Sequence, residues 1–330
     1  FFLLVLFLPF LEIQFGNAPD YATYSFWFSN EPELISRSSP SFNALIHIFN
    51  NLGLSYDSWR VFILLIFIFL ISRTSIYYSK KYQSFFSYKH INSSLVFIAA
   101  PLVTMQSSVI RQGLSFAGFY YFLNFYFYAR EKNLNLKEFL FSLSLKNIYE
   151  RFLLILSIFF IGSHMSAILL VFLLIGSEKI YEIIIKLKDL KISLINVYSL
   201  LIVFLFFIPT FFILILPRLE TRLFSETDTS SSLLIVSSFI SFLILFFDKY
   251  IKPDLKIFIT STLLSAIFVF LFSPKAAVRL AINVNSIFIL LPTYYSYLKC
   301  SKFTTVLMSM ITISLAFVSL YRGYINWIIV

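Results

Sequence analysis

Residues 151–176 read RFLLILSIFFIGSHMSAILLVFLLIG, and this stretch decides how the chain is arranged. It carries one charged residue, Arg151, and a polar break at residues 162–164. Its length suits either one helix of about 25 residues or two shorter helices that turn at the break, since a bilayer-spanning helix needs roughly 20 apolar residues. We favour two helices, because they keep the lysine-rich segment 179–191 on the same side as the other lysine-rich loops.

Each arm of this stretch is short. With about 11 apolar residues, an arm falls well under the length of a full span. The turn is therefore expected below the outer membrane surface, which places His164 within the membrane. A neutral imidazole can accept a proton near neutral pH, so a recessed His164 is a candidate general base. A purely structural histidine is the alternative interpretation.

The composition of the whole chain predicts a membrane protein. Of its 330 residues, 59% are hydrophobic and 13% are charged, whereas soluble domains are about 45 to 50% apolar and about 25% charged. So few charges cannot cover the surface of a soluble protein of this length, which excludes a water-soluble enzyme. The net charge of +10 lies on an apolar background, which excludes disordered and nucleic-acid-binding proteins. With the single Cys300 and no Cys/His cluster, we expect no internal disulfide, metal or cofactor.

Apolar runs bounded by charged residues predict an all-α polytopic membrane protein with about 11 transmembrane helices, within a range of about 10 to 12. We expect one integral membrane domain over residues 1–330. The first run is short and begins at Phe1, so we expect the natural N-terminus to lie upstream. The runs are 1–11, 59–77, 91–108, 113–128, 152–162, 166–176, 192–216, 231–247, 257–272, 280–298 and 303–320.

The basic residues separate by type when the N-terminus is placed inside. Eighteen of the 26 lie on the inner side, including 15 of the 16 lysines, as the positive-inside rule requires. Arginine dominates the outer set, and its planar fork suits bidentate phosphate recognition in a way that lysine does not. An outer side rich in arginine predicts an anionic substrate on that side. The alternative is that the two residue types are separated by chance. The outer residues are Arg37, Arg60, Arg111, Arg218, Arg222, Lys275, Arg279 and Arg322.

Arg111 is the strongest candidate in this outer set, because it stands between two apolar runs in VIRQG at 109–113. A charge at that depth is costly and usually faces a polar cavity, although snorkelling to the interface is the alternative. Arg279 and Lys275 lie at a similar helix entry, where snorkelling competes more strongly. Arg222 shares the second outer loop, 217–230, with acidic residues, so solvated ion pairs are the commoner arrangement there.

The first outer segment, residues 14–58, combines carboxylates with aromatic residues. Asp20, Glu31 and Glu33 lie close in sequence to Tyr24 and Trp27. Carboxylates that bind hydroxyls beside aromatic faces are typical of carbohydrate sites, and a solvated acidic loop is the alternative. The apolar run 42–54 has helical spacing, which predicts an amphipathic helix on the outer surface.

Several short motifs follow one another between residues 20 and 292. In order, they are DYxxY at 20–24 with Glu31-Pro32, SPSFN at 39–43, IRQGL at 110–114, SHMSA at 163–167, and a late run from Arg279 to Pro292. Their order and spacing resemble the EpsG-like branch of bacterial Wzy-type polysaccharide polymerases. The chain departs from that pattern where it lacks a basic residue before Asp20 and has Ser115 in place of the commoner alanine.

The resemblance implies a GT-C-like integral membrane glycosyltransferase in the bacterial cytoplasmic (inner) membrane, with its active site facing the periplasm. Such enzymes join undecaprenyl-diphosphate-linked oligosaccharide repeats into O-antigen, capsular or exopolysaccharide, without a metal or a nucleotide sugar. The implied partners are the lipid-linked oligosaccharide, membrane lipid, and a chain-length regulator and a flippase of the same pathway. A lipid-linked oligosaccharide flippase and an O-antigen ligase remain alternatives. A transporter would be expected to have two related halves, and no repeat is visible.

The expected roles follow from the same resemblance. Arg111 and Arg279, helped by Lys275 or Arg222, would hold the diphosphate and stabilise the leaving group. His164 would accept the proton of the attacking hydroxyl. Sugar hydroxyls would be positioned by Asp20 and Glu31, with Glu31 as the alternative base. Tyr24 and Gln112 belong to the matching motifs and are expected at the substrate site.

Overall fold

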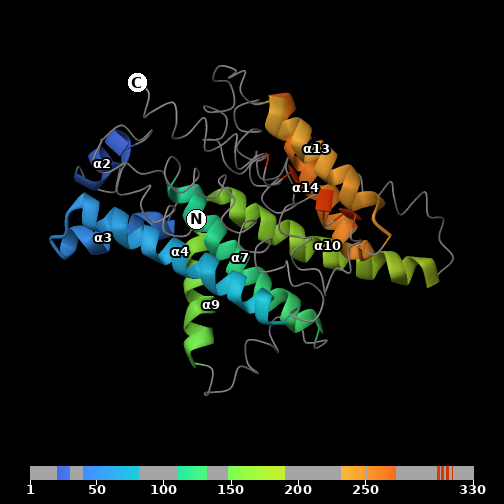
Figure 1. Cartoon of the computed structure of the whole chain (residues 1–330), viewed down its shortest axis with the longest axis horizontal. Coiled ribbons are helices and arrows are strands. Elements are labelled where there is room, and N and C mark those ends of the chain that lie inside the picture. Colours follow the sequence, from blue (N-terminus) through green and yellow to red (C-terminus); the bar gives the residue numbers. More distant parts are fainter. Residues whose placement is uncertain are drawn as a thin grey trace. The chain divides into compact units, whose positions relative to one another are not determined.

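The computed structural model describes residues 21–29, 40–81, 110–131, 148–189, 232–249 and 251–272, together with single helical positions between 303 and 314. All the regular elements within these ranges are helices (Figure 1). None of the described helices is both long enough and apolar enough to cross a membrane. The chain divides into two compact units, residues 1–168 with 312–330 (unit 1) and residues 169–311 (unit 2).

Unit 1 is built around α7 (Ile110–Glu131), which packs against α4 (Tyr56–Lys81) and α9 (Ile148–Ile161). In Figure 1, α4 and α7 run in the same direction, and α9 stands at a steep angle to both. Two short helices, α2 (Tyr21–Ser29) and α3 (Pro40–Asn51), lie at the end of the unit where α4 and α7 begin. This end carries the candidate site.

The sequence explains both boundaries of α3. Pro40 occupies the first helical position, where its missing N–H costs nothing. At the other end, Gly53 adopts a left-handed φ of 66°. The Leu54 N–H donates to the Phe49 carbonyl at 3.1 Å, and the Gly53 N–H donates to the Asn50 carbonyl at 2.9 Å. These bonds form a Schellman motif. A helix is therefore present at residues 40–51, over most of the apolar run 42–54 that was expected to be helical.

Close contact between α7 and α9 depends on Gly118. A Cβ at this position would lie 2.6 Å from the Ser157 carbonyl oxygen and 3.0 Å from the Phe160 Cβ. The Ser157 hydroxyl donates a hydrogen bond of 2.6 Å to the Gly118 carbonyl, which fixes the same contact. Small residues and interhelical hydrogen bonds are how helices associate where the hydrophobic effect cannot drive them together.

We expect Gly118→Ala to lower the thermal unfolding midpoint of the detergent-solubilised protein. The added methyl overlaps backbone atoms that cannot rotate away, and such overpacking costs about 1 to 3 kcal/mol. Gly176→Ala is the matched control, because Gly176 lies in a helix with nothing within 4 Å of an added Cβ. The control should gain about 0.5 to 1 kcal/mol from helix propensity. Equal midpoints for the two variants would contradict the close contact.

The outward faces of α4 and α9 are as apolar as their buried faces. Phe62, Leu65 and Phe69 follow helical spacing along α4, and their exposed fractions are 40%, 53% and 39%. Several small polar residues are instead buried, among them Thr74, Ser115 and Ser157. Large contiguous apolar surfaces on a protein mark an interaction with another apolar phase or partner. The exposed apolar residues of α9 are Ile148, Tyr149, Phe152, Ile155 and Ile158.

The structure confirms the predicted helix break. α9 ends at Ile161, residues 162–164 form the connection, and α10 (Met165–Asp189) begins directly after His164. The expected end of the second helix at Gly176 is wrong, because α10 continues to Asp189. Residues 177–189 contain neither glycine nor proline, and Lys179 pairs with Glu182 at 2.9 Å one turn later. The end of an apolar run is therefore not the end of this helix.

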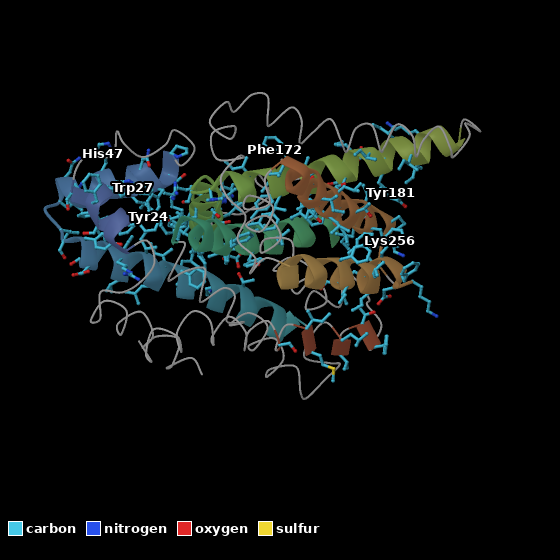
Figure 2. All side chains as sticks on the ribbon, turned by 90° about the horizontal axis from the view of Figure 1, so that it is seen from above. Tyr24, Trp27, His47, Phe172, Tyr181 and Lys256 are labelled. Atoms are coloured by element: carbon cyan, nitrogen blue, oxygen red, sulfur yellow. The ribbon has the colours of Figure 1, made fainter. Side chains whose placement is uncertain are left out.

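Unit 2 contains the rest of α10 and the helices α13 (Ser232–Phe247) and α14 (Pro253–Phe272). α13 and α14 pack together, and Pro253 opens α14 at the first helical position. The Lys256 Nζ lies 5.6 Å from the centre of the Phe246 ring (Lys256 is labelled in Figure 2). The described helices α4, α7, α13 and α14 cover nearly all of the expected apolar runs 59–77, 113–128, 231–247 and 257–272. The runs 1–11, 91–108, 192–216 and 280–298, the outer loop 217–230 and most of 303–320 lie outside the described residues.

Candidate functional site

Arg111 lies among three aromatic rings at the start of α7. It is the second residue of that helix, and only 9% of it is exposed. Its guanidinium carbon Cζ lies 5.1 Å from the ring centre of Trp27 and 5.9 Å from those of Tyr24 and Phe42. The Arg111 Nε donates a hydrogen bond of 3.4 Å to the Tyr24 hydroxyl. We call Tyr24, Trp27 and Phe42 the aromatic cage.

The cage is held by further aromatic contacts. Tyr24 lies 5.2 Å from Trp27 and 5.6 Å from Phe42, measured between ring centres. Phe42 meets the fully buried Trp59 of α4 at 5.3 Å in an edge-on arrangement, a favourable geometry for aromatic pairs. The Asn50 side chain donates a 2.6 Å hydrogen bond to the carbonyl of Phe28, which joins α3 to the end of α2. The cage is thus fixed by three helices.

The electrostatics of this place favour an anion. Arg111 stands in the first turn of α7, where the helix dipole presents its positive end. A buried cation and a helix N-terminus therefore add their positive potentials at one point. The aromatic faces offset part of the cost of burying the guanidinium, by about 0.5 to 2 kcal/mol for each well-placed ring. The arrangement suits a negatively charged group near Arg111.

The turn between α9 and α10 carries the second half of the site. The backbone N–H groups of Gly162, Ser163 and His164 donate to the carbonyls three residues earlier, at 3.1, 2.9 and 3.4 Å. His164 is partly exposed and Ser163 is fully buried. Within the described part of the chain, the buried Ser163 hydroxyl has no hydrogen-bond partner.

The turn and the aromatic cage meet at the start of α3. Gly162 faces Ser41 so closely that a Cβ at residue 162 would overlap the Ser41 hydroxyl oxygen. Ser41 is buried and directly precedes Phe42 of the cage. The IRQGL, SPSFN and SHMSA motifs, which are far apart in the sequence, therefore lie in one region of unit 1. Figure 2 labels Tyr24 and Trp27 at this end of the unit, together with His47 of α3.

The predicted site residues divide between those the structure places and those it does not. Arg111 and Tyr24 are in direct contact, and His164 lies on the turn that borders the same region. Gln112 belongs to α7, next to Arg111, but its side chain lies outside the described part of the chain. Five further residues also lie outside the described residues, namely Asp20, Glu31, Arg222, Lys275 and Arg279.

Sequence reasoning gave no site role to several residues that shape this region. Phe42 and Ser41 belong to the SPSFN motif and Ser163 to the SHMSA motif, without an individual role for any of them. Arg60, in α4, is 4% exposed and was counted among the outer arginines without a role. The pattern that singled out Arg111, an arginine at the entry to an apolar run, also applies to Arg60 and could have found it.

Comparisons with protein family models, with curated proteins and with solved structures found no match to this chain. Within the described residues, no group of three or more Asp, Glu, His and Cys side chains is placed to hold a metal ion.

Proposed function

We propose that this chain is an integral membrane glycosyltransferase that polymerises undecaprenyl-diphosphate-linked oligosaccharide repeats at the outer face of the bacterial cytoplasmic membrane. The observation that carries the proposal is the nearly buried Arg111 in its aromatic cage, beside the turn that bears His164. The residue proposed to bind phosphate and the residue proposed to accept the proton thus belong to one region of unit 1, which supports the proposal. Aromatic rings, which commonly pack against sugars, line the same place.

The surface of unit 1 supports the membrane part of the proposal. The apolar stripes on α4 and α9 would face lipid chains, while the buried hydroxyls and the Ser157–Gly118 hydrogen bond would join the helices inside. The composition agrees, since 13% charged residues are too few for the surface of a soluble protein of this length. An arginine placed deep among apolar helices is a functional residue by default.

The proposed reaction is a displacement at the anomeric carbon of the donor sugar. The hydroxyl at the non-reducing end of the incoming repeat forms the new glycosidic bond, and the bond from the anomeric carbon to the diphosphate oxygen breaks. His164 takes the hydroxyl proton. Arg111 stabilises the negative charge that develops on the departing lipid diphosphate. The growing chain passes to the new lipid carrier, and undecaprenyl diphosphate is released.

A reconstitution assay tests this function. Cells that naturally make the protein are expected to accumulate single lipid-linked repeats when its gene is deleted, and these lipids provide the substrate. Purified protein in liposomes should convert them to a ladder of longer glycans. Movement of unmodified repeats across the bilayer would instead identify a flippase, and transfer onto lipid A core without elongation would identify a ligase. Either outcome would contradict the proposal.

A further inference from the structure

Ser41, which directly precedes Phe42 of the aromatic cage, lies in close contact with Gly162 of the His164 turn. An ideal Cβ at residue 162 would overlap the Ser41 hydroxyl oxygen and would lie 3.6 Å from the Ser41 Cβ. The same Cβ would lie 3.1 Å from the Phe159 carbonyl oxygen, so Gly162 is also close to its own helix end. Glycine at residue 162 leaves room for the Ser41 hydroxyl, and its φ lies outside the left-handed region.

The contact between Ser41 and Gly162 lies within one or two residues of Phe42 on one side and of His164 on the other. Phe42, which directly follows Ser41, is fully buried, and its ring lies 5.9 Å from the Arg111 guanidinium. His164 lies two residues beyond Gly162, at the start of the next helix. A shift of the turn away from α3 would therefore move His164 relative to Arg111, without altering either residue.

We infer that Ser41 and Gly162 act as positioning residues, which set the His164 turn against the Arg111 cage. The consequence for catalysis rests on the proposed function. Catalytic groups must be held to within about 0.5 Å of their productive geometry, and a displacement of about 1 Å can cost about a hundredfold in rate. A methyl added at residue 162 has to be accommodated either by rotation of the Ser41 hydroxyl or by a shift of the turn.

A cysteine pair tests the contact independently of any activity. The Cβ separation of 3.6 Å falls within the 3.5 to 4.5 Å typical of disulfides. In a Cys300→Ser background, Ser41→Cys with Gly162→Cys should crosslink under mild oxidation, as read by mass spectrometry of the joined peptides. Ser41→Cys with Gly53→Cys is the control, since these residues lie at opposite ends of the same helix. Failure of the first pair to crosslink more than the control would overturn the inference.

A double-mutant cycle tests the positioning role. Gly162→Ala should lower the kcat for elongation per folded molecule by about tenfold or more, with KM little changed, because a misplaced base slows chemistry without weakening binding. Adding Ser41→Ala removes the overlapping oxygen and leaves the two Cβ atoms in ordinary contact at 3.6 Å. The double variant should recover most of the lost kcat, and Ser41→Ala alone completes the cycle.

The outcomes separate the positioning role from the proposed function. A merely structural contact would lower the thermal midpoint of Gly162→Ala and leave the kcat of its folded fraction unchanged, which would overturn the inference. Additive losses in the double variant would overturn it as well. If wild-type protein made no polymer, the proposed function would fail, whereas the crosslink would still decide whether Ser41 and Gly162 are in contact.

Discussion

Replacing Arg111 by lysine is expected to reduce polymer elongation by about a hundredfold to a thousandfold, the loss typical of removing one donor to a developing anion. Lysine keeps the positive charge but loses the planar fork and the Nε that bonds the Tyr24 hydroxyl at 3.4 Å. It also loses the flat contact with the Trp27 ring. Initial rates of ladder formation in liposomes measure the effect.

Arg73→Lys is the matched control for this experiment. Arg73 also lies over an aromatic ring, with its Cζ 5.3 Å from the ring centre of Tyr149, but it belongs to the far half of α4. Its replacement should leave the elongation rate within about threefold of wild type, as expected for one partly exposed cation–π contact worth about 0.5 to 1 kcal/mol. Equal losses in the two variants would mean that Arg111 has only a packing role.

The second large effect is expected from His164→Asn. An asparagine keeps hydrogen-bonding capacity but cannot accept the proton of the attacking hydroxyl, so kcat should fall by about a hundredfold to ten-thousandfold. The wild-type rate should decline as the pH is lowered through the range where histidine gains its proton, because only the neutral imidazole is a base. The residual rate of the variant should lack that decline.

An unchanged pH profile in the His164→Asn variant would contradict the role of His164 as base. It would direct attention to Glu31, the alternative base suggested by the order of the motifs. Glu31→Gln is then the informative comparison, because it keeps the shape of the side chain and removes its ability to accept a proton. The two variants measured over the same pH range assign the proton transfer to one residue or the other.

Sequence patterns predicted where a helix is interrupted better than how far a helix extends. The polar break at residues 162–164 correctly separated two helices, since three small or polar residues interrupt a long apolar run. The length of α10 was missed, because a segment of mixed charged and apolar residues, without glycine or proline, extends it beyond the apolar run. Similarly, the Gly53 cap could be recognised as a helix stop, whereas the space that requires Gly118 could not.

The candidate site was only partly predictable, for a physical reason. Arg111 stands out because a charge within apolar sequence is costly, and this is a local property. The aromatic cage depends on residues 24, 27 and 42, which approach Arg111 only after three helices pack together. Motif order suggested that these segments belong to one function. It carried no information on which aromatic rings would surround the guanidinium.

The most direct test of the central claim counts undecaprenyl diphosphate released as repeats are joined in liposomes. Transfer of the chain from its lipid diphosphate requires one released carrier for each new glycosidic bond. For wild-type protein, we expect one released undecaprenyl diphosphate for each new glycosidic bond. For an Arg111→Ala variant that is made in normal amounts and is folded, we expect release at the background level. Elongation by the Arg111→Ala variant at the wild-type rate, or polymer made without release of undecaprenyl diphosphate, would contradict the central claim.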